Sequence, residues 1–148
     1  MEIFMENNDT INLLRECNAG VKMGVSSIDE VLDNVKNDEL KAILISSKER
    51  HEDLGNDTRQ LLNKYDESGK EPNPMAKSMS WIKTNVMLAM EDSDHTIADL
   101  MTDGCNMGVK SLNRYLNKYQ AADISAKNIA EKLIKIEENL TDDIKCYL

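Results

Sequence analysis

The sequence predicts an all-α protein: four long helices in an up-down bundle, with one additional, shorter connecting helix. Apolar residues recur at alternating spacings of three and four along most of the 148 residues, which is the spacing of one face of an α-helix. Aromatic residues make up only 4% of the chain, and both prolines, Pro72 and Pro74, lie in one place. Long stretches free of helix breakers remain on either side, and the length suits a single domain over residues 1–148.

The first helix is expected to begin after Asp9 or Thr10, because either side chain can accept a hydrogen bond from the free amides of a first turn. Asn37 and Asp38 interrupt the pattern, and Asp38 is expected to cap the second helix, so the two helices should be antiparallel neighbours. The face expected to be buried is apolar apart from one asparagine: Ile11, Leu14, Asn18, Val21, Val25, Ile28, Leu32 and Val35.

The second helix, residues 39–65, carries a histidine at the middle of its predicted buried face. That face consists of Leu40, Leu44, Ser47, His51, Leu54, Thr58, Leu61 and Tyr65. A helix this long cannot bury one face alone, so other helices must pack along it and enclose His51. The groups that these helices place opposite His51 therefore bear directly on function.

The third, connecting helix is expected at residues 75–90, after a loop at 66–74 that contains both prolines. It is apolar on more than one side, with Met79 and Ile82 on one face and Trp81 and Leu88 on another. This pattern indicates either burial between neighbouring helices or a surface used in self-association.

The fourth helix is expected to run from a cap at Ser93 or Asp94 to Tyr119, and the fifth to begin at a cap at Ser125. Gly104 and Gly108 lie inside the fourth helix, where glycine often permits close approach of another group. The residues expected to face inward on the fourth helix are Ile97, Met101, Cys105, Gly108, Leu112, Tyr115 and Tyr119. On the fifth they are Ile129, Leu133, Ile136, Leu140 and Ile144, with Glu137 and Thr141 at the edge of the face.

The net charge, the lack of long apolar runs and the cysteine spacing disfavour several binding partners and locations. The formal net charge is −9, which disfavours binding to nucleic acid or to an anionic membrane surface. No apolar run is long enough to span a membrane or direct export. Cys17, Cys105 and Cys146 are odd in number and widely spaced, so we expect reduced thiols and a cytoplasmic protein.

The inward polar residues form a weak metal-binding set. Di-iron bundles bring one Glu from each of two helices and a Glu-x-x-His from each of the other two. Here Lys48 precedes His51 by three residues, and Glu49 and Glu52 project sideways from it. A lone histidine on an apolar face is more commonly a neutral core residue. A nucleophile and base pair of Cys105 and His51 is disfavoured, because buried free cysteines commonly pack as small apolar groups.

Several segments resemble a ferritin-like family of bacterial proteins catalogued as a domain of unknown function. They are Leu13-Leu14-Arg15-Glu16-Cys17-Asn18, Arg50 and His51 followed by Leu54, the loop at 69–74, Trp81-Ile82-Lys83, and residues 112–115. The resemblance covers nearly the whole chain and implies a ferritin-like four-helix bundle. It also implies that no intact di-iron centre is present. Where such relatives tend to carry Glu-x-x-Glu, this chain has Cys105 and Gly108, and Thr141 stands where a histidine often precedes an acid.

Two functions follow from these observations. The first is a non-catalytic cytoplasmic protein that binds itself or another protein through its acidic or Met-rich surface. The second is a protein that binds iron or manganese, of the ferroxidase type, through the residues His51, Glu137, Glu16, Glu49 and Glu52. The missing Glu-x-x-His pair favours the first function, in which the protein is not an enzyme and needs no cofactor.

Overall fold

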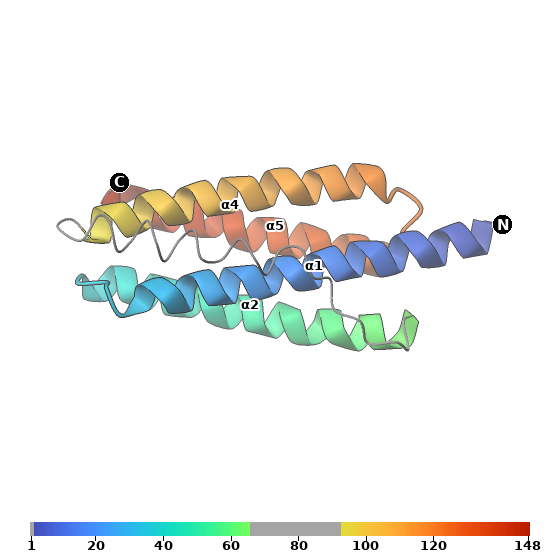
Figure 1. Ribbon diagram of the computed structural model, residues 1–148, viewed down its shortest axis with the longest axis horizontal. Helices are drawn as coiled ribbons and strands as arrows, with labels where there is room; N and C mark the ends of the chain where they lie inside the picture. The colour runs from blue at the N-terminus through green and yellow to red at the C-terminus, as the bar shows by residue number, and fades with distance from the viewer. Residues whose placement is uncertain (1, 66–92) are drawn as a thin grey trace.

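The computed structural model describes residues 2–65 and 93–148, which form long helices lying side by side (Figure 1). The helices are α1 (Glu2–Leu32), α2 (Asp38–Tyr65), α4 (Ser93–Lys118) and α5 (Ile124–Ile144), followed by the short 3₁₀ helix η2 (Lys145–Tyr147). The prediction of an all-α bundle is confirmed for this part of the chain. The connecting helix predicted at residues 75–90 lies outside the described residues.

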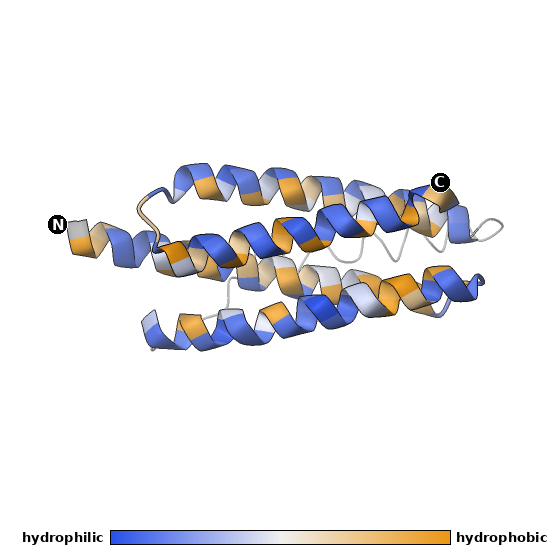
Figure 2. Cartoon of the chain, turned by 180° about the vertical axis from the view of Figure 1, so that it is seen from behind, coloured by the Kyte–Doolittle hydropathy of each residue, from blue (hydrophilic) through white to orange (hydrophobic). Residues whose placement is uncertain are grey.

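Two antiparallel hairpins make up the bundle. One consists of α1 and α2, the other of α4 and α5 (Figure 1). The hairpins meet where α5 packs on both α2 and α1 and where α1 packs on α4. The predicted antiparallel pairing of the first two helices is therefore confirmed. Apolar residues face the neighbouring helices and polar residues face outward (Figure 2), the arrangement that amphipathic helices adopt when they bury one face each. Within the described ranges, no helix is long and apolar enough to cross a membrane.

The apolar core consists of two separate clusters, one toward each end of the bundle. The first contains Leu13, Leu14, Cys17, Val21, Leu54, Leu62, Leu112, Ala122, Ala126, Ile129, Ala130 and Leu133. The second contains Ile28, Val31, Leu40, Leu44, Ile97, Leu100, Met101, Cys105, Leu140 and Ile144. On every helix there is a gap in numbering between the two clusters, and those gaps define a layer across the middle of the bundle.

The predicted start of the first helix is wrong. The helix begins at Glu2, and Asp9 and Thr10 lie within it. Their side chains instead satisfy amides of the α4–α5 loop: Ala121 N donates to Asp9 Oδ2 at 2.9 Å, and Asp123 N donates to Thr10 Oγ1 at 2.7 Å. Both residues therefore cap backbone groups that are far away in the sequence.

Two further predicted caps are shifted by one or two residues. Asn37 rather than Asp38 accepts the amide hydrogen bond of Leu40, at 2.9 Å, and so caps α2. Asp123 rather than Ser125 is the N-cap of α5, and the Ser125 hydroxyl donates to its carboxylate at 3.0 Å. In each case the carboxamide or carboxylate outside the helix reaches the free amides of the first turn.

Hydrogen bonds across the hairpins fix the two ends of the bundle. At one end the Asp94 carboxylate accepts from Lys36 N at 2.8 Å and Asn37 N at 3.0 Å. At the other end the Tyr65 hydroxyl donates to Asp123 Oδ2 at 2.7 Å. These contacts set the register of α2 against α5 and of the α1–α2 turn against α4.

The predicted buried face of α2 is confirmed from Leu40 to Thr58, after which Leu62 is buried and Leu61 only half-buried. The predicted face of α1 is too narrow: Leu13, Cys17 and Val31 are also buried. A helix packed against two neighbours buries a broader face than one row of residues provides.

Candidate functional site

The layer between the two apolar clusters contains the buried polar groups of the central bundle. We call it the mid-bundle layer and define it by Gly24 of α1, Ser47 and His51 of α2, Gly108 of α4 and Glu137 of α5. His51 is 1% exposed, Ser47 6% and Glu137 7%. His51 and Glu137, both buried and ionisable, therefore lie in one layer of the described part of the chain.

His51 is held as a neutral side chain. Its Nδ1 lies 2.8 Å from the carbonyl oxygen of Ser47, and since a carbonyl only accepts, Nδ1 carries the proton. Burial lowers the pKa of His51, and the hydrogen bond to the Ser47 backbone opposes that shift. Nε2 is buried, and no described residue forms a hydrogen bond with it.

Gly24 allows α1 to lie directly against the His51 ring. A Cβ atom at position 24 would lie 2.6 Å from His51 Cδ2 and 2.7 Å from His51 Nε2. Any side chain at that position would therefore overlap the ring. The contact between Gly24 and His51 was not predicted.

Glu137 occupies the corresponding position in the other hairpin. A Cβ atom at position 108 would lie 2.1 Å from Glu137 Oε2, so the absence of a side chain at Gly108 is what admits the carboxyl group. Burial raises the pKa of Glu137 to about 8, so the protonated form prevails at neutral pH. Within residues 2–65 and 93–148, Glu137 Oε2 has no hydrogen-bond partner. The residue was predicted at the edge of the α5 face, and it is buried.

Burial of Cys17 and Cys105 disfavours the thiolate, which is the reactive form of cysteine. Burial, and secondarily the charge of Glu137, raise the pKa of the Cys105 thiol. Burial and the nearby Glu16 raise the pKa of Cys17 to about 12. A nucleophilic cysteine needs a stabilised thiolate, and these surroundings favour the thiol in both cases.

The other predicted metal ligands lie away from His51 and Glu137. Glu49 and Glu52 are exposed on α2, and Glu16 is half-buried and hydrogen-bonded to Tyr115. In residues 2–65 and 93–148 no group of three or more His, Cys, Asp or Glu side chains is arranged to hold a metal ion.

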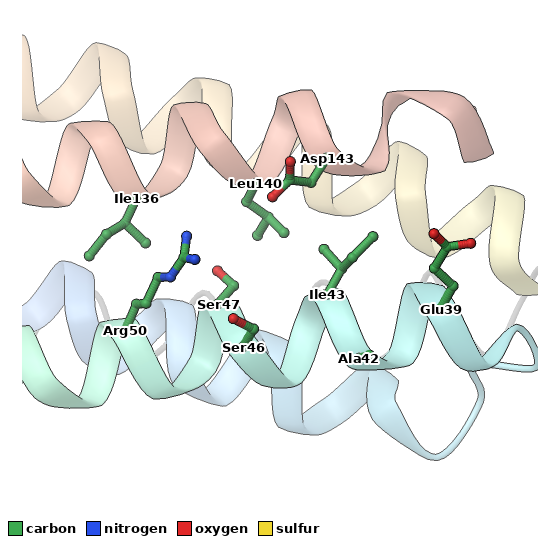
Figure 3. Close-up of a pocket in the computed structure, with 9 residues that line it drawn as sticks. All are labelled: Glu39, Ala42, Ile43, Ser46, Ser47, Arg50, Ile136, Leu140 and Asp143. Atoms are coloured by element: carbon green, nitrogen blue, oxygen red, sulfur yellow. The ribbon is translucent and has the colours of Figure 1, made fainter.

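A groove between α2 and α5 adjoins the mid-bundle layer (Figure 3). It has a volume of about 260 Å³ and is lined by Glu39, Ala42, Ile43, Ser46, Ser47, Arg50, Ile136, Leu140 and Asp143. Ser47 belongs to both features. Its carbonyl accepts a hydrogen bond from His51, and its buried side chain lines the groove, where its hydroxyl has no hydrogen-bond partner among the described residues. We call this feature the α2–α5 groove.

Sequence reasoning missed the α2–α5 groove. The signal available was the run of small residues on α2, Ala42 followed by Ser46 and Ser47, beside the predicted buried face. Small side chains along the seam between two helices leave the seam partly unfilled.

No protein family, curated protein or solved structure matches this chain.

Proposed function

We propose that this chain is a non-catalytic, ferritin-like helical bundle that acts by binding protein, either a second copy of itself or another protein, through its outer surface. The observation that carries the proposal is the packing of the mid-bundle layer. The central level, where ferritin-like bundles hold metal ions, is occupied by His51 against Gly24 and by Glu137 against Gly108.

The facing helix lies close against each of these two side chains. A carbon atom attached to Gly24 would lie only 2.7 Å from His51 Nε2, and one attached to Gly108 only 2.1 Å from Glu137 Oε2. Both groups are also favoured in their neutral forms at pH 7, whereas a carboxylate must lose its proton to bind a metal. These features support a structural role for the layer.

The surface supports a protein-binding role. The first turns of α1 extend beyond the neighbouring helices (Figure 1), and they expose Ile3 at 75%, Phe4 at 68% and Met5 at 56%. Adjacent exposed apolar side chains are typical of surfaces that bind protein. Free, buried thiols at Cys17 and Cys105 are consistent with a cytoplasmic location.

The alternative function is iron or manganese binding of the ferroxidase type. The observation that favours it is that Nε2 of His51 and Oε2 of Glu137 are both buried without a hydrogen-bond partner. Such atoms are candidate metal ligands, to which Glu16, Glu49 or Glu52 would have to be added by movement of their helices.

Elemental analysis of protein purified without chelators separates the two functions. We expect less than stoichiometric iron, manganese or zinc in the wild type and no difference in His51→Ala. Stoichiometric metal that is lost in His51→Ala, but kept in the control His95→Ala at an exposed histidine, would establish the alternative.

A further inference from the structure

We propose that the α2–α5 groove is a binding site for a free aliphatic α-amino acid. The Arg50 guanidinium and the Ser47 hydroxyl bind its carboxylate, and the Asp143 carboxylate binds its ammonium group. Its side chain packs on Ile43 and Leu140. This small-molecule site is separate from the exposed start of α1 on which the protein-binding function rests, and the inference goes beyond that function.

The groove presents two opposite charges that are not paired with each other. The Asp143 carboxylate extends from α5 into the middle of the groove, between the side chains of Arg50 and Ile43 on α2 (Figure 3). Within residues 2–65 and 93–148, the side chains of Arg50 and Asp143 take part in no ion pair or hydrogen bond. Two opposite charges that face one space without touching can each bind a charged group of a small ligand between them.

The carboxylate of the ligand is bound from α2. Ser47 and Arg50 are three residues apart, so their side chains are neighbours on one face of the helix. Ser47 is 6% exposed, and its hydroxyl oxygen points toward the groove (Figure 3) and has no hydrogen-bond partner among the described residues. A buried hydroxyl without a partner is costly. A carboxylate between these two side chains accepts a charge-assisted hydrogen bond from the guanidinium and a hydrogen bond from the hydroxyl.

The ammonium group of the ligand is bound from α5. The carboxylate and the ammonium group of an α-amino acid are attached to the same carbon, so one ligand can reach both Arg50 and Asp143 across a short gap. The competing arrangement is a direct ion pair between these two side chains. Both residues are exposed, and an exposed ion pair contributes little stability, so a ligand that separates the charges displaces a weak contact.

The remaining lining and the size of the groove select the side chain of the ligand. Ile43, Ile136 and Leu140 supply an apolar wall (Figure 3). The volume of about 260 Å³ is below the roughly 300–1,000 Å³ typical of sites for drug-sized ligands. A side chain such as that of leucine or valine suits this space. An acidic side chain is disfavoured, because Glu39 and Asp143 carry charge of the same sign.

Titration of the full chain with L-leucine, followed by two-dimensional amide NMR, tests the proposal. We expect saturable shifts at the residues that line the α2–α5 groove, with a Kd of about 1 mM. Isocaproate lacks the ammonium group of leucine and isoamylamine lacks its carboxylate, so each should bind about tenfold more weakly. L-Aspartate should also bind more weakly than leucine.

Variants of the groove assign each contact. Arg50→Gln and Asp143→Asn should each weaken leucine binding about tenfold, and Ser47→Ala by a smaller factor, because each removes a group that bonds the ligand. Asp143→Asn should also abolish the preference for leucine over isocaproate, and Arg50→Gln the preference for leucine over isoamylamine. Asp142→Asn and Arg114→Gln, at exposed residues outside the groove, are matched controls and should leave binding unchanged.

Three results would overturn the inference. The first is an absence of saturable shifts at roughly 20 mM leucine, about twenty times the expected Kd. The second is equal binding of leucine, isocaproate and isoamylamine, which would mean that the charges of the groove do not read the ligand. The third is a loss of binding in the control variants as large as in Arg50→Gln. Far-ultraviolet circular dichroism of each variant excludes unfolding as the cause. None of these results bears on the metal analysis, so this inference and the proposed function can fail separately.

Discussion

The two hairpins of this bundle solve the same packing problem in different ways. In α1–α2 a glycine faces a histidine, and in α4–α5 a glycine faces a glutamate. His51 keeps a hydrogen bond to its own helix through Nδ1, whereas Glu137 Oε2 has no hydrogen-bond partner in the part of the chain that the structure describes. The cost of burying an ionisable group therefore depends on which of its hydrogen bonds are replaced within the protein, and not on burial alone.

The protonation of the two groups sharpens the contrast. Burial pushes both toward the neutral form, which lowers the pKa of His51 and raises that of Glu137 to about 8. Proton linkage therefore gives the two hairpins opposite pH dependences. Four experiments can break or refine this comparison.

Glu137→Gln should give the largest effect. The pKa of Glu137 is about 8 in the folded state and about 4.5 without burial, so its contribution to stability is full below pH 4.5 and is lost as pH rises through 8. The free energy of unfolding should fall by up to about 1.4 kcal/mol per pH unit across this window.

The variant Glu137→Gln cannot ionise and should lack this dependence, so it should be more stable than the wild type at pH 8. Urea unfolding at pH 5, 6, 7 and 8 measures the difference. Glu138→Gln, at an exposed neighbour, is the matched control and should follow the wild type. Parallel pH profiles for wild type and Glu137→Gln would mean that the carboxyl group is ionised and solvated.

The glycines provide the second test. Gly24→Ala forces the His51 ring to turn and lose its bond to Ser47, and we expect a loss of about 2 kcal/mol. Gly108→Ala should cost less, about 1 kcal/mol, although its Cβ would come closer to its neighbour, because a carboxyl group at the end of a flexible side chain can swing away.

Gly104→Ala is the control for both glycine variants, because a Cβ there would meet no described residue within 4 Å. It should stabilise the helix by about 1 kcal/mol. Thermal unfolding measures all three. A loss for Gly108→Ala larger than for Gly24→Ala would show that the Glu137 side chain is the more rigid of the two.

The sequence predicted the mid-bundle layer only in part, and the reason is physical. Helical periodicity placed His51 on the buried face, because the spacing of 3.6 residues is a local property of α2. It also indicated close approach at Gly108, which the contact with Glu137 confirms, and at Gly104, where no described residue lies within 4 Å of an added Cβ. The contact of Gly24 with His51 depends on the register of α1 against α2. Residue spacing within a single helix does not predict that register.

The caps illustrate the same limit. Asp9 and Thr10 carry the side chains of helix caps, and they do satisfy backbone amides, but these amides belong to a loop more than 100 residues away. The chemical type of the residue predicts that it will accept a hydrogen bond. The identity of the donor is set by the packing of the hairpins.

His51→Leu should have a small effect at neutral pH. The substitution removes one hydrogen bond to a carbonyl and also removes the unpartnered Nε2, so we expect the helix content to persist and the melting temperature to rise or barely change. Because the pKa of His51 is lowered in the folded state, wild-type stability should fall as pH drops below 6.5.

The variant His51→Leu should lose that acid sensitivity, while His95→Leu, at the exposed histidine, should retain it. Circular dichroism melts at pH 5, 6 and 7 make the comparison. A loss of several kcal/mol in His51→Leu at pH 7 would instead show that the histidine anchors a polar network.

The cysteines report on each hairpin separately. Cys17 lies on α1 and Cys105 on α4, both buried, whereas Cys146 is exposed. A disulfide reagent at pH 8 should therefore modify one thiol rapidly and two slowly. Local opening sets the slow rates, because buried thiols react only when they become exposed.

Ionisation of Glu137 near this pH weakens the α4–α5 hairpin, so Cys105 should react faster than Cys17. Cys17→Ala and Cys105→Ala assign the two rates, and Glu137→Gln should slow Cys105 alone. Equal slow rates that Glu137→Gln leaves unchanged would mean that the two hairpins open together, as a single cooperative unit.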